Sequence, residues 1–162
     1  MQVDRPYLPG YGFEPVRAIG DLLPWEWALT RLERAQNYWV ATASASGVPH
    51  LAAVWGVWLG GALYFSTGGA SVKARNLAVS ARCVVTPEHA DESVVVHGVA
   101  ERVGDPAAVD FVRRAFLEKY GDGFPDVATN PLFAVAPRVV IGLVSNEDFG
   151  RLATRWHFTT ID

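Results

Sequence analysis

The sequence has a single cysteine, Cys83, among its 162 residues. One cysteine excludes an internal disulfide and is typical of a reducing compartment, so the sequence favours a cytoplasmic location. Because Cys83 lies in an apolar run, we expect a buried, unreactive thiol and not a nucleophile. The N-terminus lacks a basic segment followed by an apolar one, so we expect no secretory signal.

Long apolar runs and clusters of positive charge are also missing. The most apolar segment, residues 51–63, contains glycines and alternates in character, so it does not have the pattern of a membrane-spanning helix. The net charge is −3, and the 14 basic residues, of which two are lysines, form no stripe. The sequence therefore predicts no membrane partner and no nucleic-acid partner.

Several signatures of catalytic and metal sites are absent as well. None of the four histidines has another histidine or a cysteine three or four residues away, so the spacing predicts no metal site. The sequence contains no nucleophile elbow, P-loop or dinucleotide-binding glycine motif. A haem held by one axial histidine stays open, with His50 or His97 as the ligand.

Apolar and aromatic residues are abundant instead, at 50% and 12% of the chain. This composition supports one domain with a substantial core, which we place at residues 21–162, behind a proline-rich N-terminal arm at residues 1–20. The periodicity predicts helices at about 24–35, 71–80 and 105–120. It predicts strands at 37–45, 48–59, 62–67, 82–86, 93–102 and 132–144.

Short turns join most of these strands, which makes them antiparallel. Paired glycines, Gly60 and Gly61, are typical of a tight hairpin turn. Closing six such strands into a barrel leaves no exposed edge. The predicted fold is therefore mainly β (α+β), a six-stranded antiparallel barrel with flanking helices.

The segment YFSTGGASVKARN, residues 64–76, carries the strongest functional pattern. It joins a strand to a helix through two glycines and gathers hydroxyls, cations and a helix N-terminus, which together suit a phosphate or another anion. The residues concerned are Ser66, Thr67, Lys73, Arg75 and Asn76. The alternative is a helix capped by Ser71 after a tight turn, with its cations merely solvated.

Aromatic residues surround the approach to this loop. Trp55, Trp58, Tyr64 and Phe65 lie on the hairpin that leads into it. They are candidates for the core, but a buried indole needs a partner for its N–H, so tryptophan also lines half-open pockets. A planar ring bound beside a phosphate would be adjacent to such side chains.

Five segments stand out by their order and spacing: YWVATASASGVPH (38–50), AVWGVWLGGALYFST (53–67), SVKARNL (71–77), VVVHGVAERVGDP (94–106) and TRWHF (154–158). In this order they resemble the split β-barrel proteins of the pyridoxamine-phosphate oxidase and flavin/deazaflavin oxidoreductase superfamily. The resemblance runs from about residue 22 to 158, and its final motif, T-R-W-x-F, is similar to the branch that uses the deazaflavin coenzyme F-420.

The resemblance implies a homodimeric six-stranded split barrel with a groove for FMN or F-420 at each end of the interface. It implies that the phosphate contacts Ser66, Thr67, Lys73 and Asn76, with Arg75 nearby. It implies that the ring lies along Val54, Trp55 and Gly56, and that Arg155 and Trp156 approach the site. Trp58, Trp156 and His157 are then candidates for the wall of a substrate pocket.

Three residues depart from the family pattern. Val72 stands where the family usually has an arginine beside the lysine, which removes one phosphate contact. Gly56 stands where a bulky residue is common, so we expect a wider ring pocket. His157 replaces a frequent arginine.

The sequence thus predicts a cytoplasmic, homodimeric oxidoreductase that transfers a hydride from reduced F-420 to a small, electron-poor organic substrate. The alternatives are an FMN-dependent oxidoreductase on the same fold, a carrier or haem-binding protein without turnover, and a member that has lost its cofactor.

Overall fold

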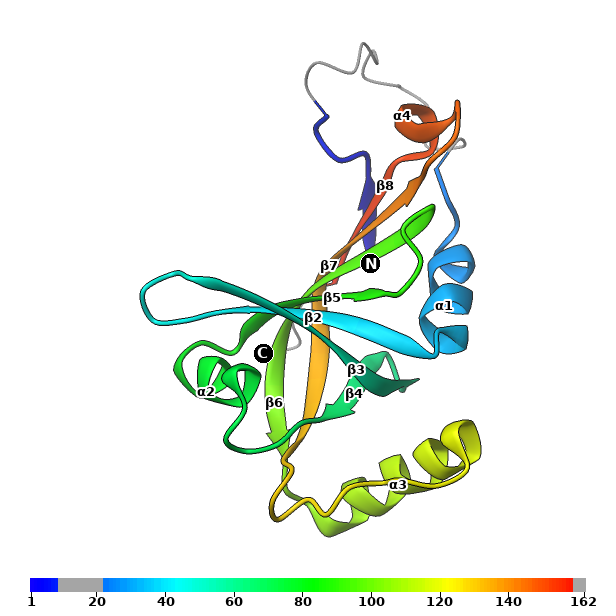
Figure 1. Cartoon of the computed structure of the whole chain (residues 1–162). Helices are drawn as coiled ribbons and strands as arrows, with labels where there is room; N and C mark the ends of the chain where they lie inside the picture. The colour runs from blue at the N-terminus through cyan, green and yellow to red at the C-terminus, as the bar shows by residue number, and fades with distance from the viewer. Residues whose placement is uncertain (9–21, 159–162) are drawn as a thin grey trace.

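The computed structural model describes residues 1–8 and 22–158 of the chain. Most of the expected N-terminal arm, residues 9–20, therefore lies outside the described residues. The elements in chain order are β1 (Gln2–Asp4), α1 (Trp25–Arg34), β2 (Asn37–Ala43), β3 (Pro49–Leu59), β4 (Ala62–Ser66), α2 (Val72–Val79), β5 (Arg82–Pro87), β6 (Glu92–Val103), α3 (Pro106–Tyr120), β7 (Leu132–Val144), α4 (Phe149–Leu152) and β8 (Thr154–His157) (Figure 1).

Six strands close into a barrel in the order β7-β4-β3-β2-β5-β6, and the β6–β7 ladder completes the ring. Every pairing in the ring is antiparallel. The predicted six-stranded antiparallel barrel is confirmed. Closure gives each of these strands two hydrogen-bonded neighbours over part of its length, which removes the exposed edges of an open sheet.

Strand β7 changes neighbours along its length. Its first part pairs with β4 from Leu132 to Val135, and its later part pairs with β8 from Val139 to Gly142. A register shift in the β6–β7 ladder lies between these two parts, at His97 and Gly98. The strand β8 and its outer neighbour β1 thus extend the sheet beyond the barrel.

Local sequence explains the turns and helix starts. Gly60 and Gly61 both have positive φ, at 56° and 83°, which confirms the predicted β3–β4 hairpin. Asp105 caps α3, because its Oδ2 accepts the N–H of Ala108 at 2.9 Å, and Pro106 follows at the first helical position.

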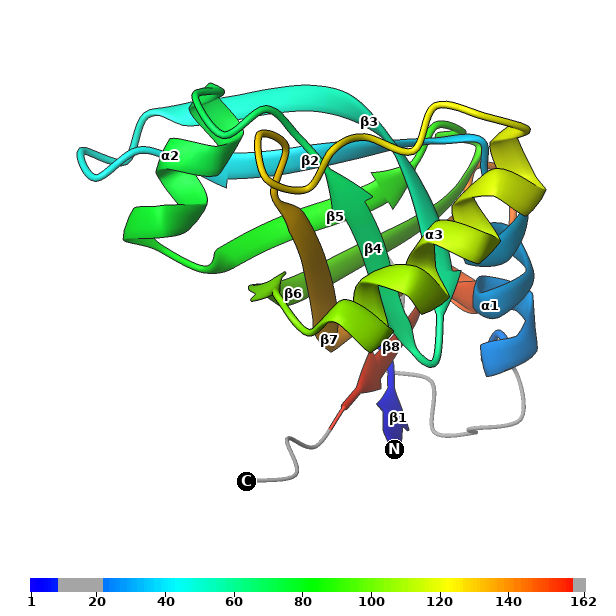
Figure 2. The ribbon, with the colours of Figure 1, turned by 90° about the horizontal axis from the view of Figure 1, so that it is seen from below.

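The helices cover the barrel on different sides (Figure 2). In both views α1 and α2 lie on opposite sides, and α3 lies below β3 and β4 in Figure 1 and passes in front of β4 in Figure 2. The barrel interior is filled by side chains such as Tyr38, Val40 and Phe65. A second apolar cluster joins α3 to the barrel through Val112, Phe116 and Val57. No helix in the described part of the chain is long and apolar enough to cross a membrane.

Candidate functional site

The loop after β4 is held by the segment that precedes β7. The hydroxyl of Ser66 donates to the carbonyl of Asn130 at 2.7 Å. The N–H groups of Thr67 and Gly69 donate to the carbonyls of Pro131 and Thr129, at 3.3 and 3.0 Å. These bonds fix the path of the glycine loop. The hydroxyl of Ser66, which was predicted to contact an anion, donates its hydrogen bond within the chain.

The N-terminus of α2 follows directly. Ser71 accepts the N–H of Ala74 at 3.2 Å, and its Oγ lies 3.1 Å from the hydroxyl of Thr67. The serine cap of the alternative interpretation is therefore present. Among the described residues, no acceptor takes the N–H groups of Val72 and Lys73. They remain open at the positive end of the helix dipole, which is the arrangement that binds anions.

The three polar side chains of α2 have different surroundings. Lys73 is half-buried, and its amine has no hydrogen bond or ion pair within the described ranges. Arg75 is exposed and donates to the carbonyl of Ala70 in the loop. Asn76 is buried, and its Nδ2 donates to Thr42 Oγ1 at 3.0 Å. This bond joins α2 to β2, and a contact between the Asn76 amide and an anion stays a prediction.

Strand β3 presents one of the three predicted ring contacts to solvent. The side chain of Val54 is buried, whereas Trp55 is 50% exposed. Trp55 stacks flat on Tyr120, with ring centroids 4.7 Å apart and planes within 4°. The stack holds the indole in one orientation on the outside of the barrel.

Gly56 faces the barrel interior. A Cβ there would lie 2.9 Å from the carbonyl oxygen of Tyr64, 3.2 Å from Leu63 and 3.3 Å from Tyr38. The expected wider ring pocket is therefore wrong for this face, because core atoms fill the space. The glycine allows close packing of two strands and one buried ring.

The main chain of Gly56 is held by the last turn of α3. Lys119 Nζ donates to the Gly56 carbonyl at 2.8 Å, and the Gly56 N–H donates to Tyr120 Oη at 2.9 Å. Strand β2 pairs with β3 only as far as Asn37 and Trp55, so these side chains replace the missing strand partner. The sequence analysis did not identify this link, since no spacing rule relates residue 56 to residues 119 and 120.

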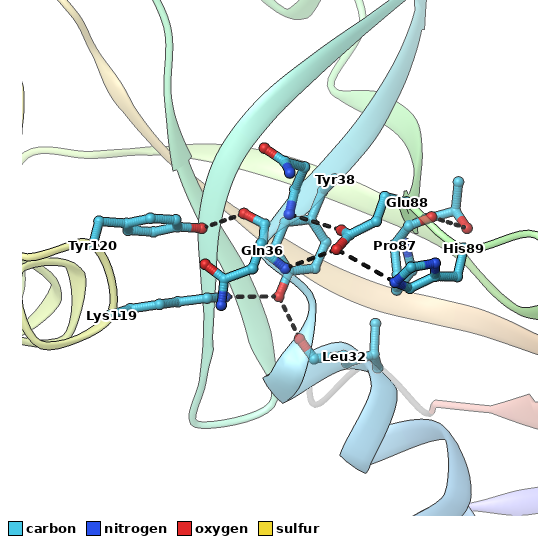
Figure 3. Close-up of polar contacts among 10 residues, drawn as sticks. Leu32, Gln36, Tyr38, Pro87, Glu88, His89, Lys119 and Tyr120 are labelled. Atoms are coloured by element: carbon cyan, nitrogen blue, oxygen red, sulfur yellow. Dashed lines mark hydrogen bonds and ion pairs between the residues drawn. The ribbon is translucent and has the colours of Figure 1, made fainter.

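The same two side chains belong to a larger polar network (Figure 3). Lys119 also lies 3.3 Å from the hydroxyl of Tyr38, and the Tyr120 hydroxyl is 2.7 Å from the carbonyl of Gln36. Burial lowers the pKa of Lys119 and raises the pKa of Tyr38. Burial alone would raise the pKa of Glu88, but the N–H groups of Asn37 and Gln36 lower it overall. The Tyr38 hydroxyl also donates to the carbonyl of Leu32 in α1, so the network joins α1, β2 and α3 around Gly56 of β3.

Two predicted site tryptophans lie in the core instead. Trp156 is 1% exposed and packs edge-on against Trp25, with centroids 5.5 Å apart. Gly142 makes room for it, since a Cβ there would lie 2.8 Å from the indole. Trp58 is also buried, and its N–H has no partner among the described residues. The expectations that Trp156 approaches the site and that Trp58 forms a substrate wall are corrected for the single chain.

The other two C-terminal candidates pair with β1. Arg155 binds Asp4 through two hydrogen bonds, of 2.7 and 2.8 Å, and His157 Nε2 lies 3.1 Å from the same carboxylate. The bonds from Arg155 lower the pKa of Asp4. In Figures 1 and 2, β8 and α2 lie well apart. One chain therefore does not bring Arg155 and His157 next to Lys73.

The candidate haem ligands occupy different environments. His50 is half-buried, and its Nδ1 has no partner within the residues described, whereas His97 is exposed on the outside of β6.

Cys83 is buried, and burial raises its thiol pKa to about 11. The predicted burial of this thiol is confirmed.

The barrel agrees with a comparison at the level of sequence families. The model of the pyridoxamine 5'-phosphate oxidase family matches residues 26–143. The chain belongs to this family. No curated protein sequence matches it.

Solved structures share the fold at low sequence identity. The haem storage protein HutZ from Vibrio cholerae is 18% identical, with a TM-score of 0.59 over 70% of this chain and 86% of that one. An F-420 reductase is 24% identical, with a TM-score of 0.54 over 67% and 90%. A conserved hypothetical protein from Mycobacterium tuberculosis is 24% identical, with a TM-score of 0.62 over 76% and 86%. At these identities the likeness concerns the fold alone.

Proposed function

We propose that this chain is a cytoplasmic, homodimeric oxidoreductase that transfers a hydride from reduced coenzyme F-420 to a small, electron-poor organic substrate. The observation that carries the proposal is the unpaired amine of Lys73 beside two open N–H groups at the start of α2, among the residues that the structure describes. Membership of an oxidase family and the likeness to an F-420 reductase support it.

The residues at α2 fit the acidic end of F-420 or FMN. The phosphate would accept the N–H groups of Val72 and Lys73 and pair with the Lys73 amine. Arg75 adds a second cation, although its guanidinium also donates a hydrogen bond to the Ala70 carbonyl. Ser66 and Asn76 are already engaged within the chain, so we assign them to shaping the loop.

Strand β3 fits the ring end of the same cofactor. Trp55 offers an exposed aromatic face held by Tyr120, and Lys119 and Tyr120 fix the main chain of Gly56. A deazaflavin bound here supplies the reactive carbon for hydride transfer. The chain would supply position and shelter from water.

Separate titrations of the purified protein with F-420, FMN and haem test this proposal. We expect F-420 to bind most tightly, followed by hydride transfer to an electron-poor acceptor. Tighter binding of FMN than of F-420 would favour the alternative of an FMN-dependent oxidoreductase. Binding of haem alone, without turnover, would favour the haem-binding alternative, which is the kind of protein that HutZ is named for.

Replacing Lys73 with alanine should weaken F-420 by about ten- to hundredfold, because a charge-assisted contact contributes about 1.5–3 kcal/mol. Isothermal titration measures the change. Arg114→Ala is the matched control, since Arg114 is an exposed cation on α3. Equal affinity in the Lys73 variant and the wild type would place the phosphate elsewhere.

The reverse change tests the departure at Val72. This residue begins α2 and is 40% exposed, so an arginine there can be accommodated without disturbing the core. We expect Val72→Arg to tighten F-420 by about tenfold, as one added phosphate contact would. An unchanged dissociation constant would show that residue 72 does not face the phosphate.

The proposed dimer has a suitable face on the outside of β2 and β3. Trp39, Leu51 and Trp55 point outward there and are 41%, 60% and 50% exposed. Register places Trp39 beside Ala53 and Leu51 beside Ala41, so the apolar face is continuous. Exposed apolar patches of this kind mark association sites. A second copy would also supply C-terminal residues, such as Arg155, that one chain keeps away from α2.

Sedimentation tests the dimer directly. We expect twice the chain mass of 17.6 kDa at micromolar concentration, and a stable interface of roughly 2,000 Å² in total. Leu51→Glu should shift the protein toward the monomer, because it places a charge in the apolar face. Wild-type protein that sediments as a monomer would contradict both the dimer and the sharing of the site.

A further inference from the structure

A hollow lies at one end of the barrel, between α2, the last residues of β6 and the segment that precedes β7. It has a volume of about 440 Å³ and is called the α2–β6 hollow here. Its size falls within the range of sites for small organic ligands, about 300–1,000 Å³, and the mouths of barrels often hold such sites. None of the described residues that line it belongs to β2 or β3, whose outer face is the proposed dimer contact.

The hollow forms because β6 continues past the start of β5. The ladder between the two strands ends where the Ala100 N–H donates to the Ala81 carbonyl at 2.8 Å. The last residues of β6 then have β7 as their strand neighbour on one side alone, within the described strands. Helix α2 is bonded to β2 through Asn76, and it presents Ala74 and Ala78 to the hollow. These short side chains leave the space beside β6 open.

The wall opposite α2 is fixed by hydrogen bonds within the chain. The N–H of Gly69 donates to the carbonyl of Thr129 at 3.0 Å, and Thr129 Oγ1 accepts the side-chain amide of Asn130 at 2.9 Å. The carboxylate of Asp126 accepts the N–H of Ala128 at 3.0 Å. The polar side chains of this wall are therefore already paired, and the wall is in place before any ligand binds.

One unpaired cation lies beside an aromatic ring at the mouth of the hollow. Arg102 of β6 pairs with Phe133 of β7, and both residues line the hollow. Residues directly opposite each other on antiparallel strands point to the same face. Phe133 is 8% exposed and belongs to the core, so Arg102 leaves β6 on the inner side of the barrel.

The guanidinium of Arg102 is available to a ligand. It makes no hydrogen bond or ion pair with any residue that the structure describes. No aspartate or glutamate is among the described residues that line the hollow. Elsewhere arginines of this chain do pair, as Arg31 does with Glu92 at 2.6 Å. The hollow thus combines apolar walls, one aromatic ring and one cation without a counterion.

From this geometry we infer that the α2–β6 hollow is a binding site for a small aromatic carboxylate. The ring of the ligand packs against Ala100 and Phe133, where an aromatic pair gains more than buried area alone. Its carboxylate is held by Arg102, because a guanidinium matches a carboxylate with two parallel hydrogen bonds. The described lining does not include Lys73, so the site goes beyond the proposed cofactor function.

A matched pair of probes tests the inference. Naphthoate carries a carboxylate, and naphthamide has the same rings with a neutral group of similar shape. We expect naphthoate to bind the folded protein saturably in a fluorescence titration. Arg102→Gln should weaken naphthoate by about tenfold and change naphthamide by less than about twofold, because only the carboxylate loses a charge-assisted contact. Arg102 is exposed, so the variant should fold, which circular dichroism establishes.

Two tryptophan variants of α2 locate the probe. Ala78 is exposed and lines the hollow, whereas its exposed neighbour Val79 is not among the lining residues. Ala78→Trp should fill the hollow and remove the binding of both probes, and Val79→Trp should leave both unchanged. Lys73→Ala should leave naphthoate unaffected, and F-420 should not displace it.

Several results would overturn the inference. Naphthoate that does not bind, or that binds Arg102→Gln as it binds the wild type, excludes recognition by the guanidinium. Unchanged binding in Ala78→Trp places the probe outside the hollow. Weaker binding in Lys73→Ala, or displacement of naphthoate by F-420, assigns the probe to the proposed cofactor site instead.

Discussion

Replacing Gly56 with phenylalanine is expected to unfold the barrel. A Cβ at this position would lie 2.9 Å from the main-chain oxygen of Tyr64, and the ring beyond it would overlap Leu63 and Tyr38. Backbone cannot move aside as a flexible side chain can. We therefore expect a loss of more than about 4 kcal/mol, which is large against the about 5–15 kcal/mol by which a typical domain is stable.

Gly56→Ala tests the same position with a smaller side chain. One methyl group against the Tyr64 carbonyl should cost about 1–3 kcal/mol in the free energy of unfolding, as overpacking does. Urea denaturation followed by circular dichroism measures the change. Gly104→Phe is the matched control, because nothing lies within 4 Å of a Cβ at that glycine. If Gly56→Phe folds normally and loses only cofactor binding, the interpretation of Gly56 as the cause of a wider pocket is restored.

Truncation of Trp156 to alanine is expected to lower the free energy of unfolding by about 3–5 kcal/mol, the usual cost of removing a buried tryptophan. The indole is 1% exposed, packs on Trp25 and fills the space above Gly142. Because it lies in the core of its own chain, we expect the F-420 dissociation constant of the folded variant to stay unchanged.

Chemical denaturation and a titration of the same protein samples measure these two quantities. For the stability measurement alone, Arg155→Ala is the neighbouring control, since Arg155 is partly exposed and its pair with Asp4 should contribute about 1 kcal/mol or less. A Trp156 variant of normal stability with weakened F-420 binding would contradict the core assignment. It would return Trp156 to the site that the family resemblance implied.

The candidate site shows which features can be predicted from residues that are neighbours in the sequence. The strand–loop–helix pattern of residues 64–76 predicted the cap at Ser71 and the cations of α2, because caps and turns depend on neighbours in the sequence. It did not predict that Ser66 and Asn76 are already engaged by Asn130 and Thr42. Those partners are 64 and 34 residues away, and no spacing rule covers such distances.

The same limit applies to the aromatic residues. Composition predicted a large core but did not assign Trp55, Trp58 and Trp156 to the surface or the interior. Alternation along β3 gives two faces, and only barrel closure decides which face is buried. Closure placed Trp58 inside and left Trp55 outside on Tyr120.

The sequence by itself determined the mainly β architecture, the six barrel strands, the Gly60–Gly61 hairpin and the starts of α2 and α3. These features follow from periodicity, turn glycines and capping side chains, which act within a few residues. The tertiary structure alone decided the sheet extension by β8 and β1, the contact of α3 with the main chain of Gly56 and the register shift at His97 and Gly98. Each of these depends on pairing between distant segments, whose register is set by the closed barrel and not by local preference.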